Sequence, residues 1–277
     1  MVTAAAPAPR SPRKVSYPSE FFVTLVALIA TVVVVHGLYV AWIQPVGDEI
    51  VAAEQARMKA DPDYVPERSL FLVINAPEQE VEIIHFVWAL LILGYKAILI
   101  RRERQLLERE LIHVPEGIKV LPEDAKDYAR QLEALPPEDK PMLVVRALQR
   151  TLDRFAATRS IRDSAETSKT VCESEADRLD SGLAMIRYIA WAIPAIGFIG
   201  TVRHIGDALL QAHKAVTGDI SGVTSGLGIA FNATFLALSL TLVLMFFLHQ
   251  LQQRQEQFVH DTDHWIDQHV IRHMQVR

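Results

Sequence analysis

The order of hydrophobic and polar positions divides the chain into four apolar segments separated by strongly charged sequence. A helix needs about 20 residues to cross the hydrocarbon core of a bilayer, and each apolar segment is about that long. The sequence therefore predicts an all-α integral membrane protein. Its transmembrane helices are expected at residues 20–43, 83–100, 188–210 and 223–248.

The polar segments complete the predicted layout. Residues 1–19, rich in Ala, Pro and Ser, are expected to form a flexible tail, and residues 44–82 an acidic periplasmic segment. Basic residues flank the start of the first helix and the end of the second, so the positive-inside rule places the N- and C-termini in the cytoplasm. Long cytoplasmic helical extensions of the last two helices follow from this orientation. They comprise a stalk at 101–187 and a C-terminal helix at 249–277, and residues 211–222 form a periplasmic loop.

The stalk is polar and helix-prone, with few glycines. It is predicted to contain a continuation of the second helix to residue 112, a short helix at 122–135 and one long helix over 140–187 that runs into the third span. In the C-terminal helix, apolar residues recur at intervals of seven and form a seam, which can pack against the stalk or against a second copy of the chain. The seam consists of Leu251, Phe258 and Trp265, with Val259 and Ile266 beside them.

Composition and motifs exclude several function classes. The 277-residue chain has a net charge of −5 and no basic patch interleaved with aromatic residues, so a nucleic-acid partner is not expected. The single Cys172 cannot form an intrachain disulfide and fits no metal-site spacing. The sequence contains no phosphate-binding glycine loop, nucleophile elbow or His/Glu metal motif. We therefore expect neither an enzyme nor a cofactor or metal site.

The last two apolar helices each present a face of small, mildly polar residues. At 100° per residue, these faces consist of Pro194, Gly197, Thr201, His204 and Ala208 on the third helix, and Ala230, Thr234, Ala237 and Thr241 on the fourth. Small residues allow membrane helices to approach closely, and this helix-packing role is assigned to Pro194, Gly197, Gly200, Gly226 and Ala230. The hydroxyls of Thr201, Thr234 and Thr241 are predicted to line an ion path.

These residues also carry a resemblance to a known family. The string Gly-Phe-Ile-Gly-Thr-Val at 197–202, followed by Gly226, Thr234 and Leu238, resembles the MotA/TolQ/ExbB proton channel family. The resemblance covers the last two spans and their flanks. Four spans are typical of the MotA branch, whereas the span sequences are closer to the TolQ and ExbB branch, whose members usually have three.

The resemblance implies a function and a set of partners. The chain would be the channel-scaffold subunit of a proton-driven stator or energy-transducing complex in the bacterial inner membrane. It would form a homo-oligomer, most simply a pentamer, around the single membrane helices of a TolR/ExbD/MotB-like partner. That partner supplies the essential proton-carrying Asp. The alternative from a different class is a structural or sensory membrane scaffold without ion conduction, in which the threonines would tolerate replacement by Val.

Three polar residues lie in the outer third of the third span: Arg203, His204 and Asp207. A charge at bilayer depth costs about 2.5–3.5 kcal/mol on insertion scales, so each requires an explanation. In one interpretation Arg203 pairs with Asp207 one turn further on, and both reach outward. In the other, His204 shares the face of Thr201 and modulates the ion path. Because two hydroxyls offer few ligands for Na⁺, the expected ion is H⁺.

Overall fold

The computed structural model describes residues 20–60, 64, 69–109, 111–112, 114, 118–215, 218 and 220–276. The predicted tail at 1–19 lies outside these residues. Within the described parts all regular elements are helices, and four helical stretches are long and apolar enough to cross a membrane. The all-helical class and the four candidate membrane-spanning helices are therefore confirmed.

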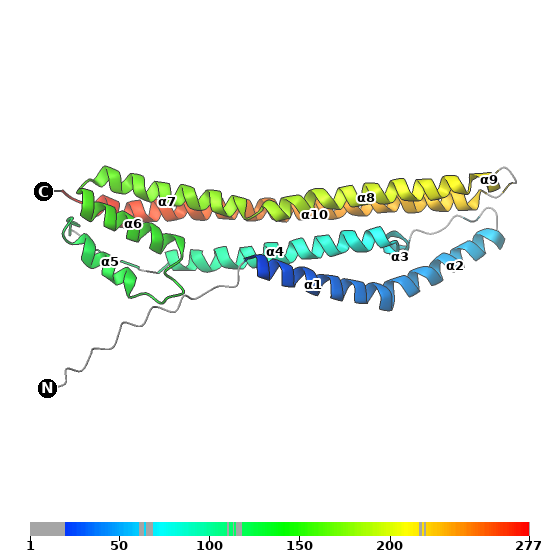
Figure 1. The fold of residues 1–277 in the computed structure, drawn as a ribbon, viewed down its shortest axis with the longest axis horizontal. Coiled ribbons are helices and arrows are strands. Elements are labelled where there is room, and N and C mark those ends of the chain that lie inside the picture. The colour runs from blue at the N-terminus through cyan, green and yellow to red at the C-terminus, as the bar shows by residue number, and fades with distance from the viewer. Residues whose placement is uncertain are drawn as a thin grey trace, which may run out of the picture.

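The N-terminal helices form one bent rod beside the rest of the molecule (Figure 1). Helix α1, Glu20–Leu38, passes through the π-helical turn Tyr39–Ile43 into α2, Gln44–Ala60. Helix α1 packs on α4, where the indole of Trp88 donates a hydrogen bond to the Thr24 carbonyl at 2.9 Å. The outward side of α1 keeps its large apolar residues exposed, as expected for a helix at the periphery of a membrane bundle.

The second spanning helix begins earlier than predicted. After the short α3, Leu70–Ile74, helix α4 runs from Pro77 to Leu107. Proline is favoured in the first turn of a helix because its missing N–H has no intrahelical partner there. The acidic residues 78, 80 and 82, predicted to lie in the polar segment before the helix, therefore belong to the first turns of α4.

Helices α8 and α10 form an antiparallel pair (Figure 1). Helix α8, Ala184–Leu210, lies along α10, Ser221–His269, and the short α9, Ala212–Ala215, lies between them in the chain. With 49 residues, α10 is about 73 Å long, well beyond a bilayer. Helix α4 packs against both α8 and α10. Their shared core is made of aliphatic side chains: Ala89, Ile92 and Leu93 of α4, Ile186, Ile189 and Ile193 of α8, and Leu244 and Leu248 of α10.

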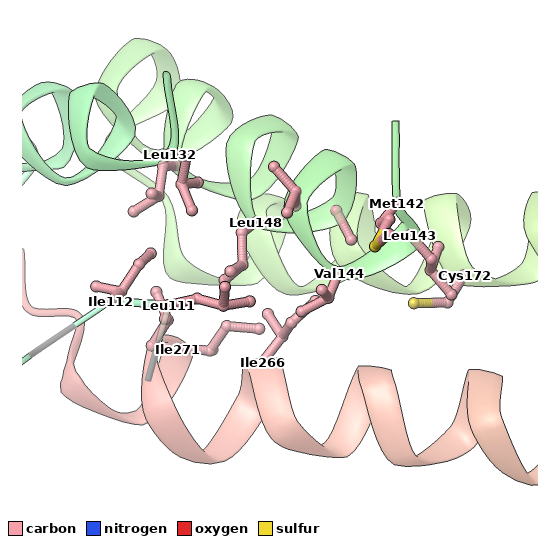
Figure 2. Close-up of a cluster of buried hydrophobic side chains, with 14 of the residues drawn as sticks. Leu111, Ile112, Leu132, Met142, Leu143, Val144, Leu148, Cys172, Ile266 and Ile271 are labelled. Atoms are coloured by element: carbon pink, nitrogen blue, oxygen red, sulfur yellow. The ribbon is translucent and has the colours of Figure 1, made fainter. Parts of the chain in front are cut away.

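At one end, helices α5, α6 and α7 of the stalk pack with the part of α10 beyond residue 248 around a second core, the stalk core. Helix α5 is Ala125–Glu133, α6 is Leu143–Thr158 and α7 is Ile161–Ser181. Leu148 and Phe155 of α6 are fully buried in its core (Figure 2 shows Leu148).

The prediction of a single long helix over 140–187 is wrong, because the chain turns back between α6 and α7. Arg159 adopts a left-handed conformation with φ of 53° and ends α6. The Ser160 hydroxyl then accepts a hydrogen bond from the Asp163 amide at 3.2 Å and caps α7. A serine that satisfies a free amide in this way favours the start of a new helix over continuation of the old one.

The apolar seam of the C-terminal helix packs within the chain. Phe258, Val259 and Ile266 belong to the stalk core, and Trp265 packs against it. The chain end is also tied down, because the Val120 amide donates to the His273 carbonyl at 2.8 Å and the Gln275 amide donates to the Val120 carbonyl at 3.0 Å. Of the two alternatives for the seam, the structure shows contact with the stalk of the same chain.

Candidate functional site

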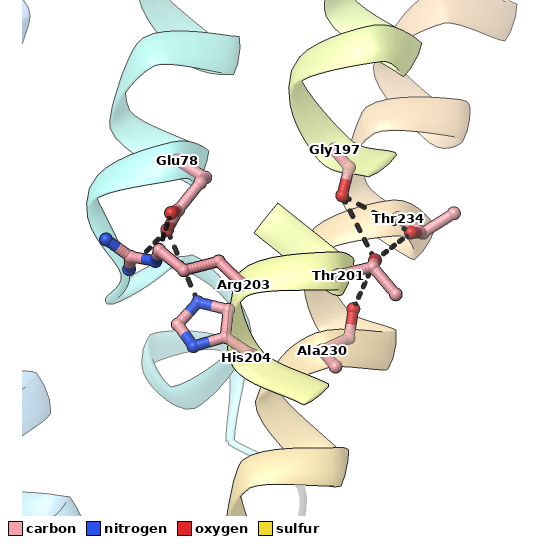
Figure 3. A network of polar contacts seen from close by, with 7 residues as sticks. All are labelled: Glu78, Gly197, Thr201, Arg203, His204, Ala230 and Thr234. Carbon is pink, nitrogen blue, oxygen red and sulfur yellow. Dashed lines mark hydrogen bonds and ion pairs between the residues drawn. The ribbon is translucent and has the colours of Figure 1, made fainter. Parts of the chain in front are cut away.

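The threonines of α8 and α10 meet at the centre of the site (Figure 3). The Thr201 and Thr234 hydroxyls are in direct hydrogen-bond contact. Thr201 Oγ1 also lies 2.9 Å from the Ala230 carbonyl oxygen across the helix interface and 3.0 Å from the Gly197 carbonyl oxygen of its own helix. A hydroxyl has one proton to donate, so these acceptors compete for it. The pair therefore offers a hydroxyl proton with several alternative acceptors between two membrane-spanning helices.

Close backbone approach at three glycines makes this contact possible. A Cβ on Gly197 would lie 2.5 Å from the Ala237 Cβ, and one on Gly226 would lie 2.8 Å from the Ala208 Cβ. On the side facing α4, a Cβ on Gly200 would lie 2.9 Å from the Glu78 Cγ. All these separations are shorter than van der Waals contact. The small face of α8 is thus enclosed by α10 on one side and α4 on the other.

The partner of Arg203 differs from the predicted one. Its guanidinium pairs with Glu78 of α4, with Nε 2.8 Å from Oε1 and NH2 3.0 Å from Oε2 (Figure 3). His204 Nε2 lies 3.3 Å from the same carboxylate. The predicted Arg203–Asp207 pair is therefore wrong, and Asp207 is exposed. This two-point ion pair, with a hydrogen bond from NH2, is possible because α4 starts early enough to bring a carboxylate alongside Arg203.

One turn further along α4 lies a carboxyl group that the sequence pattern does not single out. Glu82 is fully buried, and neither of its carboxyl oxygens has a hydrogen-bond partner among the described residues. Gln79, beside it on the helix, is equally buried, and its amide oxygen and nitrogen are also without partners there. Pro77 and the four-residue spacing of Glu78 and Glu82 suggest that Gln79 and Glu82 lie in a helix. The sequence does not indicate that Glu82 lies beside Gly197 of α8.

The remaining predicted residues lie around this cluster. Thr241 is half-buried on α10, and its hydroxyl donates to the Ala237 carbonyl of its own helix at 2.8 Å, so the structure does not bring it to the threonine pair. Pro194 is half-buried within α8, and Ala230 is fully buried. Among the described residues, no group of three or more His, Cys, Asp or Glu side chains could hold a metal ion.

Comparison with known proteins finds a family model that matches part of the chain. Residues 140–264, from just before α6 to within α10, match the model of the MotA/TolQ/ExbB proton channel family. No curated protein and no solved structure matches the chain. The matched range contains the threonine pair, the three closely packed glycines and the Arg203–His204 step. The resemblance carried by these residues is therefore confirmed: residues 140–264 of this multi-pass membrane protein are similar to the MotA/TolQ/ExbB proton channel family.

Proposed function

We propose that this protein is the channel-scaffold subunit of an inner-membrane, proton-driven stator or energy-transducing complex. The observation that carries the proposal is the contact between the Thr201 and Thr234 hydroxyls on α8 and α10, inside the range matched by a proton channel family. Hydroxyls in a membrane interior either bond a neighbouring helix or line a wet path. The Thr201–Thr234 pair bonds across the helix interface, and we infer that it also lines a path. A proton can pass between hydroxyls and water without a cage of ligands, so the ion is H⁺.

A second protein supplies the principal proton carrier. The sequence of α8 has no acidic residue before Asp207, and that of α10 has none before Glu256. A TolR/ExbD/MotB-like partner with one membrane helix would bring an Asp next to the threonine pair. The protein itself forms a pentamer around this helix. Large apolar side chains on the outer sides of α8 and α10, including Phe198, Phe235 and Leu242, support contact with lipid or with other copies.

The orientation follows from the basic flanks of the spans. With both termini in the cytoplasm, the stalk lies in the cytoplasm, and the Glu78–Arg203 cluster lies toward the periplasm. A proton that moves inward through 100 mV releases about 2.3 kcal/mol. This energy would drive rotation or a conformational cycle of the partner.

The proposal is tested by proton flux through the reconstituted complex of this chain and its single-span partner. Thr234→Val removes a hydroxyl but nearly conserves volume, so we expect flux to fall at least about tenfold while insertion and assembly persist, and Thr201→Val to have a similar but smaller effect. Thr31→Val is the matched control, because that buried hydroxyl donates to the Ala27 carbonyl of its own helix, α1.

Full flux in the Thr201→Val/Thr234→Val double variant would exclude a threonine-lined path. A complex that assembles with its partner but shows no uncoupler-sensitive flux would instead support a scaffold without conduction. Flux that follows a sodium gradient after the proton gradient has been collapsed would overturn the choice of ion.

A further inference from the structure

A row of polar side chains runs from the solvent-accessible N-terminal end of α4 toward the threonine pair, and the exposed fraction of these side chains falls along the row. The Arg203 side chain is 49% exposed, those of Glu78 and His204 are each 11% exposed, and Glu82 is fully buried. Glu78 and Glu82 are four residues apart, so they lie one above the other on the face of α4 that packs against α8. The sequence of groups therefore connects the solvent-accessible end of the site to its dry interior.

Glu82 is directed at the small face of α8. Its Oε1 atom lies 3.1 Å from the position that a Cβ on Gly197 would occupy. The carbonyl of Gly197 is an acceptor for the Thr201 hydroxyl at 3.0 Å. A single glycine therefore separates the Glu82 carboxyl from the threonine pair. Gly197 lies nine residues beyond Tyr188, about 14 Å into the span, which places Glu82 at bilayer depth.

No cation is available to neutralise Glu82 among the groups described around it. On α8, Arg203 and His204 are bound to Glu78. On α4 itself, Glu80 is paired with His36 at 2.6 Å. Tyr39, in the turn after α1, is close enough to interact electrostatically with Glu82, but its hydroxyl donates its hydrogen bond to the Ile74 carbonyl. The membrane part of α10, residues 223–248, has no titratable side chain.

An ionised carboxylate without a cation or donor is strongly unfavourable in such a site, and binding a proton removes its charge. We propose that Glu82 is a proton-carrying group within this chain, loaded from the periplasmic side through Glu78 and discharged toward the Thr201–Thr234 pair. This role rests on the proposed function. In the loading step the O–H bond of protonated Glu78 breaks and an O–H bond forms on Glu82. Only the proton moves, and Glu78 returns to its ion pair with Arg203.

The first test measures the bound proton in the purified full-length chain, without a partner. Infrared spectra of the protein in lipid nanodiscs should show a carboxylic-acid C=O band that shifts with isotope-labelled glutamate and in D₂O. Glu82→Gln should remove this band, whereas Glu80→Gln on the same helix should keep it. A spectrum unchanged by Glu82→Gln would overturn the proposal, whatever the outcome for the threonine variants.

The second test uses the complex with its partner. Glu82→Gln preserves side-chain volume, so the oligomer should assemble, but we expect proton flux to fall at least about tenfold, with partial recovery in Glu82→Asp. Full flux in Glu82→Gln would show that the group binds a proton outside the path, and would overturn the relay. Loss of flux in the threonine variants with full flux in Glu82→Gln would leave the proposed function standing and remove only this inference.

Discussion

At the scale of single residues, the absence of one Cβ controls how closely the spanning helices approach. Gly197 lies where α8 meets Ala237 of α10 and Glu82 of α4, and its carbonyl is an acceptor for Thr201. Gly206, on the same helix, has no neighbouring atom within 4 Å of an added Cβ. Replacing each of these two glycines by Ala therefore distinguishes the effect of close helix packing on stability from the effect of helix propensity.

We expect Gly197→Ala to destabilise the protein by about 1–3 kcal/mol, because the new methyl group overlaps the Ala237 side chain. The thermal unfolding midpoint in detergent measures this change. Gly206→Ala is the control and should be neutral or slightly stabilising, since Ala is the better helix former by about 1 kcal/mol. Equal midpoints for the two variants would contradict close packing at Gly197.

At the scale of helices, a buried carboxylate joins α6 to α7 in the stalk. The Glu175 side chain is 2% exposed, accepts a hydrogen bond from Arg146 of α6 at 2.6 Å and is also bound by Arg178 of its own helix at 3.0 Å. Burial by itself would raise the pKa of this carboxyl, but the hydrogen bonds from Arg178 and Arg146 outweigh it and lower the pKa. This acid is therefore held ionised by its two arginine partners.

Glu175→Gln is expected to lower the free energy of unfolding by about 1–3 kcal/mol at pH 7. A depressed pKa stabilises the fold above the pKa of the unfolded state, about 4.3, and this contribution disappears as the pH falls through the folded value. The difference between wild type and variant should therefore shrink below about pH 4. Glu173→Gln, at an exposed pair with Lys169 on the same helix, is the control and should cost much less.

At the scale of the whole molecule, two cores are joined by helices that belong to both. Helices α4 and α10 contribute to the membrane core and continue into the stalk core. A displacement of α10 at bilayer depth is therefore coupled to the stalk through a continuous helix. The outer sides of α8 and α10 remain covered with large apolar residues, some of which we expect to be covered by other copies.

The purified chain is accordingly expected to be a homo-oligomer, most simply a pentamer, when its mass is measured by native mass spectrometry from detergent or nanodiscs. Liposomes that contain the chain alone should leak few protons, because the Asp of the proposed partner would be missing. A stable monomer, or substantial proton leak without a partner, would contradict this arrangement.

The sequence by itself determined the spanning helices and the faces that they share. Apolar run length and a period of 3.6 residues are local properties, so four spans, the glycines around Gly197, and Thr201 and Thr234 could all be identified before the fold was known. The family resemblance came from the same local strings. The same reasoning placed Thr241 with the other threonines, but the structure leaves it bonded to its own helix.

Only the tertiary structure decided which groups meet between helices. Arg203 pairs with Glu78, 125 positions earlier, instead of with Asp207 one turn away, and Glu82 faces Gly197. These contacts depend on where α4 begins and on its register against α8, which are set by the packing of side chains far apart in the sequence. The turn at Arg159 was missed for a related reason: a left-handed residue followed by a serine cap is compatible with the local sequence, but burial of both α6 and α7 against α10 selects it.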